Sequence, residues 1–172
     1  RGKTLGIVGI GRIGQATAKM ALGLGMKVIA ADSFIPQVDV KVEFFDGQSI
    51  TTTIVSQSLE SLFKEADFIT LHVPAQDGYI VDEAALAIMK DGVGIVNCAR
   101  GGVIDEVALI KALDSGKVSF AGLDVFESEP KPEMTILMHP KISLTPHIGA
   151  ATGEAQDRIG TELASQIISI LS

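Results

Sequence analysis

Residues 5–14 read LGIVGIGRIG, and this stretch decides the fold. An apolar run typical of a buried strand leads directly into the spacing Gly9-x-Gly11-x-x-Gly14. Gly9 allows a tight turn, Gly11 lets the backbone approach a pyrophosphate, and Gly14 lets a helix pack closely on a strand. The stretch therefore predicts a strand, a turn and a helix whose N-terminus binds phosphate groups.

The flanking residues extend this prediction to a dinucleotide site. Arg12 and Ile13 open the predicted helix, where backbone N–H groups are free to bind a pyrophosphate. The next apolar run, Lys27–Ala31, predicts a second strand, and Asp32 follows it directly. An acid at this place accepts hydrogen bonds from the adenosine ribose and repels a 2′-phosphate, which favours NAD over NADP. The alternative is an ordinary solvated aspartate in a turn.

Strand and helix patterns alternate along the rest of the chain. We expect Asp82 to cap a helix that runs to Met89, and Asp105 to cap one that ends at Gly116. The alternation predicts an α/β fold with a doubly wound, Rossmann-type sheet of about six parallel strands. The expected strands are Leu5–Ile10, Lys27–Ala31, Phe68–Val73, Gly94–Cys98, Phe120–Val125 and Ile142–Thr145.

Two helices are expected to bury an apolar stripe. In the first helix, which should stop at Gly25, the stripe comprises Ile13, Ala16, Thr17, Met20, Ala21 and Leu24. In the last helix it comprises Ala155, Ile159, Leu163 and Ile167, at four-residue spacing. The end of that last helix is apolar on several faces, which favours cover by another surface.

One segment breaks the alternation. Apolar residues alternate strictly from Val38 to Phe44, Asp46-Gly47 provides a tight turn, and a run of Thr, Ile and Val follows. This pattern predicts a β-hairpin near residues 38–55, where a crossover helix would be expected. Two interpretations remain open: a peripheral addition at the sheet edge, or a contact surface for a partner subunit.

The composition argues against several classes of partner and location. A net charge of −7, 5% aromatic residues and no Trp disfavour binding to nucleic acid or to an anionic membrane. No apolar stretch approaches the ~20 residues that a membrane-spanning helix needs. Cys98 is the only cysteine, so no internal disulfide is possible and a cytoplasmic location is expected. We assign no metal ligands.

Polar groups gather at the predicted carboxyl ends of the later strands, where such sheets bind ligands. Arg100 can hold a carboxylate with its planar, charged fork, and His147 can exchange a proton near neutral pH. Asp124, Glu127 and Glu129 follow the strand between them, and a carboxylate beside His147 would fix its tautomer and favour the imidazolium. Taken alone, each of these residues also fits an ordinary surface or loop position.

The sequence also resembles a known family. With Asp32, the motifs GIGRIG (9–14), HVP (72–74), NCARGGVIDE (97–106), LDVFESEP (123–130) and TPHIGA (145–150) resemble, in order, those of the D-isomer-specific 2-hydroxyacid dehydrogenases. NCARGG together with DVFESEP is most similar to the D-3-phosphoglycerate dehydrogenases. The resemblance covers nearly the whole chain and implies the NAD-binding domain of an oxidoreductase.

The resemblance also implies a role for individual residues. Arg100, Glu129 and His147 match the catalytic arginine, glutamate and histidine of the family, whereas Glu127 does not match the catalytic acid. The implied cofactor contacts are Gly9, Gly11, Arg12, Ile13, Gly14, Asp32, Val73, Pro74, Cys98, Ala99, Arg100, Asp124, His147, Ile148, Gly149 and Ala150.

The implied reaction is hydride transfer between NAD and a small D-2-hydroxy acid. Oxidation of 3-phosphoglycerate, for serine biosynthesis, is the first expectation. Reduction of glyoxylate or hydroxypyruvate is the enzymatic alternative. An NAD-sensing, corepressor-like binding module is the alternative from another class, and turnover on a panel of 2-hydroxy and 2-oxo acids separates it from the enzymes.

Two segments depart from the family pattern: residues 32–67 are longer than their usual counterpart, and AQDG after Pro74 is shorter. In the family, the NAD-binding domain is inserted into a substrate domain built from both ends of the chain. We therefore expect residues 1–172 to be an NAD-binding domain excised from a two-domain enzyme, without the substrate domain. Such a chain should bind NAD weakly, be inactive alone and form a homodimer through exposed apolar surfaces.

Overall fold

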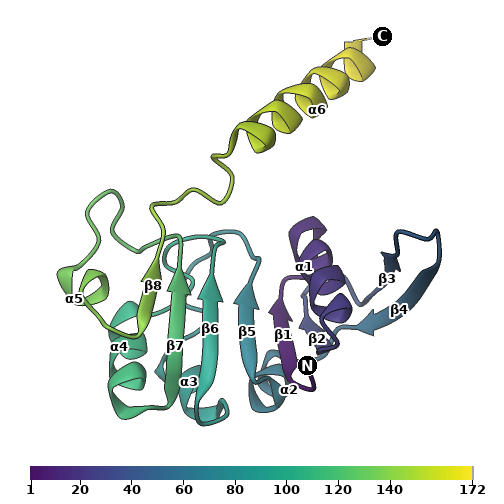
Figure 1. Cartoon of the computed structure of the whole chain (residues 1–172). Coiled ribbons are helices and arrows are strands. Elements are labelled where there is room, and N and C mark those ends of the chain that lie inside the picture. Colours follow the sequence, from purple (N-terminus) through teal and green to yellow (C-terminus); the bar gives the residue numbers. More distant parts are fainter. Residues whose placement is uncertain (172) are drawn as a thin grey trace.

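A parallel sheet forms the centre of the molecule (Figure 1). The computed structural model describes residues 1–171. The strands lie in the order β2-β1-β5-β6-β7-β8 and pair in parallel throughout. They are β1 (Thr4–Val8), β2 (Lys27–Ala31), β5 (Phe68–Leu71), β6 (Val93–Asn97), β7 (Val118–Leu123) and β8 (Ile142–Leu144). The expected doubly wound fold is confirmed, and its strand order reverses at β1, the kind of point where such sheets bind ligands.

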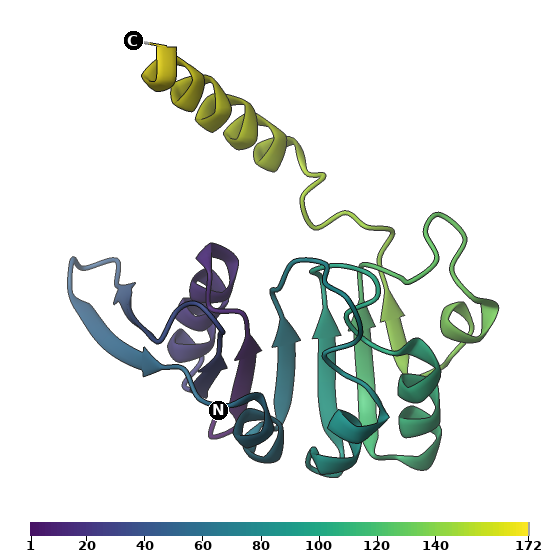
Figure 2. The same ribbon diagram turned by 180° about the vertical axis from the view of Figure 1, so that it is seen from behind.

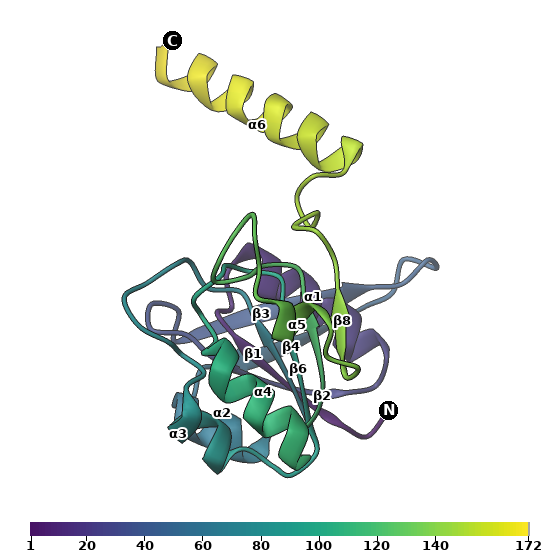
Figure 3. The ribbon, with the colours of Figure 1, turned by 90° about the vertical axis from the view of Figure 1, so that its left-hand side faces the viewer.

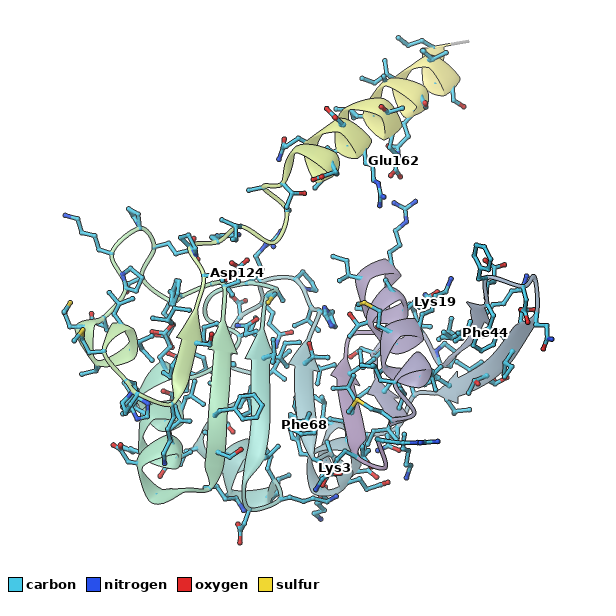
Figure 4. The ribbon with its side chains drawn as sticks, in the orientation of Figure 1. Lys3, Lys19, Phe44, Phe68, Asp124 and Glu162 are labelled. Atoms are coloured by element: carbon cyan, nitrogen blue, oxygen red, sulfur yellow. The ribbon has the colours of Figure 1, made fainter. Side chains whose placement is uncertain are left out.

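Helices cover the two faces of the sheet unequally. On one face, α2 (Leu59–Glu65), α3 (Glu83–Ile88) and α4 (Glu106–Ser115) enclose the larger apolar core (Figure 3). On the other face, α1 (Arg12–Gly23) packs on β1, on β2 and on residues 37–43 of the hairpin described below. Beyond α1, the rings of Phe68 and Phe120 lie 6.1 Å apart, and Phe120 is exposed. Figure 4 labels Phe68 on this open part of the sheet.

The predicted helix ends are confirmed where a cap was expected. Asp82 Oδ1 accepts a hydrogen bond from the backbone N–H of Ala85, and Asp105 Oδ1 accepts one from that of Ala108. Gly116 closes α4 with a φ of +83°, the left-handed conformation that favours glycine at this place. These caps fix the residues at which α3 and α4 start.

The predicted buried stripe of α1 is wrong. Its large apolar members are exposed: Ile13, Met20 and Leu24. The residues that α1 buries are Gly14, Ala18 and Ala21. A Cβ on Gly14 would lie 2.2 Å from the carbonyl oxygen of Gly9, so α1 sits too close to the β1 turn for larger side chains. Only Ala21 belongs to both the predicted and the observed buried set.

The predicted hairpin is confirmed as β3 (Gln37–Glu43) and β4 (Ser49–Val55), which pair antiparallel. It projects from the sheet edge beside α1 and β2 (Figure 2). Val40 and Ile54 are buried in a second, smaller core with Ala18 of α1. At the tip, Phe45 is fully exposed. The hairpin therefore extends the sheet edge at its base, and its use as a subunit contact stays a prediction.

The last helix does not bury its apolar stripe. After α5 (Met134–Leu137) and β8, the chain forms α6 (Gly153–Leu171), which stands away from the body in Figures 1 and 2. No residue of α6 is buried, and Ile159, Leu163 and Ile167 are each about half exposed. The expected stripe thus exists but faces solvent in this chain. Within residues 1–171, no helix combines the length and the apolar character that crossing a lipid bilayer requires.

Candidate functional site

The glycine-rich turn has the geometry that the sequence predicts for a dinucleotide site. Gly9 has a φ of +90°, and a Cβ there would lie 2.5 Å from the carbonyl oxygen of His72. A Cβ on Gly11 would meet nothing within 4 Å, so open space lies in front of this residue. Gly11 is the N-cap of α1 and makes no side-chain cap bond. Backbone N–H groups at this helix end remain available to an anion such as a pyrophosphate.

A groove of about 510 Å³ extends from this turn across the carboxyl ends of β1, β2 and β5. Five of the predicted cofactor residues line it: Gly9, Gly11, Asp32, Val73 and Pro74. The same groove is lined by residues that the sequence analysis missed, among them Phe34, Gln57 and Ser58. Gln57 and Ser58 follow β4, so the unusual hairpin brings them there. The residues present therefore fit the adenosine half of NAD.

Asp32 is held in place by the backbone around it. Its Oδ2 accepts from the N–H of Ile10 at 2.8 Å, and its Oδ1 accepts from those of Phe34 at 2.8 Å and Ile35 at 3.0 Å. Burial acts to raise the pKa of this carboxyl, but the three N–H donors outweigh it and the pKa lies below its usual value. An ionised carboxylate offers about four acceptor positions, which leaves room for a ribose hydroxyl.

Arg12 and Ile13 lie at the start of α1 with exposed side chains that do not line the groove. The Arg12 guanidinium forms an ion pair with Glu162 of α6, with 2.8 Å between Nη1 and Oε1. Figure 4 labels Glu162 on the side of α6 that faces α1. Only the backbone groups of Arg12 and Ile13 are therefore placed for the predicted pyrophosphate contact in this structure.

His147 and Glu129 form the pair that the sequence analysis predicted. His147 Nδ1 lies 2.8 Å from Glu129 Oε2, while Glu129 Oε1 accepts from the backbone N–H of Phe126 at 3.0 Å. The hydrogen bond from His147, followed by that from Phe126, holds the pKa of Glu129 below its usual value. An ionised carboxylate can only accept, so Nδ1 carries the proton. Nε2 is then the ring nitrogen that can exchange a proton with a substrate.

Asp124 builds the turn that presents His147. Its side chain is only 3% exposed, and it accepts hydrogen bonds from the Thr145 hydroxyl and from the N–H groups of Ile148 and Gly149. Burial acts to raise the pKa of Asp124, but these donors lower it below its usual value. His147 has a φ of +56°, a conformation that costs non-glycine residues about 1–3 kcal/mol. The hydrogen bonds of the buried Asp124, which Figure 4 labels, stabilise this strained turn.

Arg100 lies apart from this pair. Its side chain is exposed, and its Nη1 donates to the carbonyl oxygen of Ala99. Within residues 1–171 no hydrogen bond or ion pair joins Arg100 to Glu129 or His147. The turn itself is ordered by Asn97, which donates to the Arg100 carbonyl and accepts from the Ala99 N–H. Asn97 stands in the quoted NCARGG motif, so the sequence contained a signal for this residue.

A second pocket, of about 430 Å³, adjoins the His147–Glu129 pair. Apart from these two residues and Thr145, its walls are apolar: Phe126, Pro130, Pro132, Leu137, Leu144 and Pro146. Apolar walls lower the local dielectric constant, which strengthens the interaction between the imidazole and the carboxylate. Of the remaining predicted contacts at this end, Ala99 is buried, whereas Cys98 and Ala150 are exposed. Burial, with the charge of Asp124, raises the pKa of the Cys98 thiol.

Proteins of known activity resemble the chain over almost all of its length. It is 49% identical over 175 residues to the hydroxypyruvate reductase of Thermotoga maritima, covering 99% of this chain and 53% of that protein. It is 45% identical over 172 residues to the D-3-phosphoglycerate dehydrogenase of Methanocaldococcus jannaschii, covering 99% of this chain and 31% of that protein. The chain thus spans about half the length, or less, of these relatives.

Solved structures show the same fold. A glyoxylate reductase from Paecilomyes thermophila superposes with a TM-score of 0.78 at 41% identity, covering 94% of this chain and 47% of that one. A D-lactate dehydrogenase from Aquifex aeolicus, complexed with NAD and lactic acid, gives a TM-score of 0.75 at 34% identity. The similarity covers 98% of this chain and 53% of that one.

The family model that matches is that of the D-isomer specific 2-hydroxyacid dehydrogenases, NAD binding domain, over residues 1–149. The match includes the glycine-rich turn, the acid after β2 and the turn that carries His147. The recognition made from the motifs is therefore confirmed at the level of the family. The chain belongs to the D-isomer specific 2-hydroxyacid dehydrogenases, of which it provides the NAD-binding domain.

Proposed function

We propose that this chain is the cofactor-binding domain of a dehydrogenase that moves a hydride between NAD and a small D-2-hydroxy acid. The observation that carries the proposal is the contact of 2.8 Å between His147 and Glu129. This pair lies at the carboxyl ends of the strands, as the dinucleotide turn does. Relatives of similar sequence are about twice as long or longer, which supports a second domain as the other wall of the cleft. The activity is therefore proposed for the full-length polypeptide.

In the proposed reaction, His147 Nε2 takes the substrate hydroxyl proton during oxidation and returns it during reduction. Glu129 stabilises the imidazolium that forms, because its carboxylate lies on the other ring nitrogen. Arg100, whose guanidinium is exposed, binds the substrate carboxylate. NAD, when bound, supplies the acceptor or donor of the hydride. The groove lined by Gly9, Gly11 and Asp32 holds its adenosine and pyrophosphate.

For the substrate, we propose 3-phosphoglycerate, with hydroxypyruvate or glyoxylate as the second candidate. The first is supported by the motifs NCARGG and DVFESEP and by the D-3-phosphoglycerate dehydrogenase relative. The second is supported by the hydroxypyruvate reductase relative, which is slightly more similar, and by the glyoxylate reductase structure. Rates of the full-length protein on the three compounds, with NAD or NADH as the direction requires, decide between them.

Substitutions in the full-length enzyme test the assigned roles. We expect His147→Ala to lower kcat by ~10²–10⁴-fold, the usual contribution of general acid–base catalysis. Arg100→Ala should raise KM for the substrate and lower kcat. Glu129→Gln should shift the pH dependence of kcat, because a neutral amide no longer favours the imidazolium. His139→Ala is the control, since this histidine pairs with Asp114 on α4. A loss in His147→Ala no larger than in this control would contradict the proposal.

We also propose that the protein forms a homodimer. The support is apolar surface that this chain leaves exposed, chiefly the stripe of α6 at Ile159, Leu163 and Ile167. Surface of this kind is normally covered in solution.

A further inference from the structure

Two glutamates outside the proposed catalytic trio exchange backbone hydrogen bonds. Glu106, the first residue of α4, accepts from the N–H of Glu127 through Oε1 at 2.8 Å. Glu127, in the loop after β7, accepts from the N–H of Glu106 through Oε1 at 2.9 Å. Glu127 Oε2 also accepts from the Tyr79 hydroxyl at 3.3 Å. We call this reciprocal pair, Glu106 and Glu127, the carboxylate latch.

One half of the latch, Glu106, is buried, and the other half, Glu127, is exposed. Glu106 is only 8% exposed, and within residues 1–171 it forms no ion pair, although buried glutamates are usually paired. Burial raises the pKa of Glu106. The hydrogen bond from the Glu127 N–H lowers this pKa, and the negative charges of Glu127 and Glu133 raise it. Both bonds of the latch run from a backbone N–H to one carboxyl oxygen. What the latch requires of each side chain is therefore a carbonyl-type oxygen.

The latch holds the loop that carries the catalytic acid. Glu127 lies between Phe126, whose N–H donates to Glu129 Oε1, and Glu129 itself, whose Oε2 contacts His147. The same loop also contacts Gly101. A Cβ on Gly101 would lie 1.8 Å from the Phe126 carbonyl oxygen, so the loop packs directly on the Gly101 backbone. The loop is thus fixed at Gly101 and at the start of α4.

We propose that Glu106 and Glu127 are positioning residues for the catalytic pair: by tying residues 126–129 to α4, they keep Glu129 Oε2 on His147 Nδ1. Neither glutamate is in hydrogen-bond contact with His147, so both act through Glu129. The catalytic meaning of the latch rests on the proposed function. The effect of the latch on the His147 ring is independent of the proposed function, because the ring can be observed without turnover.

The first experiment records the ring nitrogens of His147 by ¹⁵N NMR in this chain. In the unmodified chain, the neutral ring should be almost entirely the Nδ1–H tautomer, since Glu129 only accepts. Glu106→Ala should convert His147 to a mixture of tautomers, because the released loop no longer holds Glu129. Glu106→Gln should restore the single tautomer, since the amide keeps an oxygen acceptor at the same place. Glu133, which lines a pocket beside α4 together with Glu106 and Glu127, provides the matched control: Glu133→Gln should leave the ring unchanged.

Glu127→Ala and Glu127→Gln repeat the comparison at an exposed residue, where loss of the fold is not expected. An unchanged His147 tautomer in both alanine variants would overturn the proposal. A glutamine variant in which the His147 tautomers are as mixed as in its alanine counterpart would also overturn the proposal. The charge of the carboxylate, rather than its hydrogen bond, would then hold the loop in place. In the full-length enzyme, Glu106→Ala should lower kcat by up to about 100-fold, the size of loss that a misplacement of 1 Å can cause, with KM for NAD unchanged. If the tautomers shift but no 2-hydroxy acid is turned over, the latch stands and the proposed function fails.

Discussion

At the scale of single residues, Asp32 joins the fold to the choice of cofactor. Its three backbone hydrogen bonds fix the carboxylate in the groove beside Gly9 and Gly11. A 2′-phosphate beside this carboxylate would be repelled, by up to about 4 kcal/mol at 4 Å near a protein surface. We therefore expect the chain to bind NAD at least about tenfold more tightly than NADP.

Asp32→Ser should narrow this preference, because a hydroxyl neither repels the phosphate nor accepts two ribose bonds. Isothermal titration of both cofactors measures the ratio, with Asp39→Ser as a control on the exposed side of the hairpin. Equal affinity of the unmodified chain for NAD and NADP would contradict the role given to Asp32.

Asp124 should make stability depend on pH. Its folded pKa is lowered, so the stabilisation it provides is present above the unfolded pKa of about 3.9 and is lost as the pH falls through the folded value. Asp124→Asn should cost about 1.5–3 kcal/mol at pH 7, the usual contribution of a hydrogen bond to a charged group. Urea unfolding between pH 7 and pH 3 should show a shallower loss of stability in the variant. An identical pH slope in both proteins would show that folding does not lower the pKa of Asp124.

At this scale, the sequence predicted residue types better than contacts. His147 and Glu129 were paired correctly because both stand at strand ends and match the family motifs. The latch was not predicted, because two glutamates at residues 106 and 127 have no common pattern in the sequence. The three bonds of Asp32 were missed for a related reason: backbone N–H donors leave no trace in residue identity.

At the scale of elements, the hairpin adds a core of its own. Ile54 of β4 is buried with Val40 against α1, whereas Ile50 on the same strand is exposed. Ile54→Ala should lower the free energy of unfolding by about 2–5 kcal/mol, as large-to-small core substitutions do. Ile50→Ala is the matched control and should change it by no more than about 0.5 kcal/mol. Urea denaturation measures the free energy of unfolding of both variants. Equal losses in Ile54→Ala and Ile50→Ala would mean that the hairpin does not pack on α1.

Element types were predictable because strand runs, caps and the Asp46-Gly47 turn are local signals. The buried face of α1 was not. Periodicity finds an apolar stripe, but here the tight approach to the β1 turn selects the small residues Gly14, Ala18 and Ala21 instead. For α6 the stripe was found correctly, and only its burial was wrong, because no other element of the described chain covers it.

At the scale of the whole molecule, the exposed stripe of α6 makes self-association testable. We expect the chain to sediment as a dimer at micromolar concentration. Leu163→Glu combined with Ile167→Glu should convert it to a monomer, because charges in an apolar contact are costly. Gln156→Glu, at an exposed polar position of the same helix, is the control. A monomeric unmodified chain would contradict the proposed homodimer.

The most direct test of the central claim is a titration of the ¹⁵N-labelled chain with NAD, followed by amide chemical shifts. Saturable changes should appear first at Gly9, Gly11, Asp32 and Val73, which line the groove, and at Ile148 and Gly149 beside His147. Amides of the hairpin tip around Gly47 should stay unchanged. Absence of saturable shifts up to millimolar NAD, or shifts centred away from the groove, would contradict the assignment of the carboxyl ends of the strands as the NAD site.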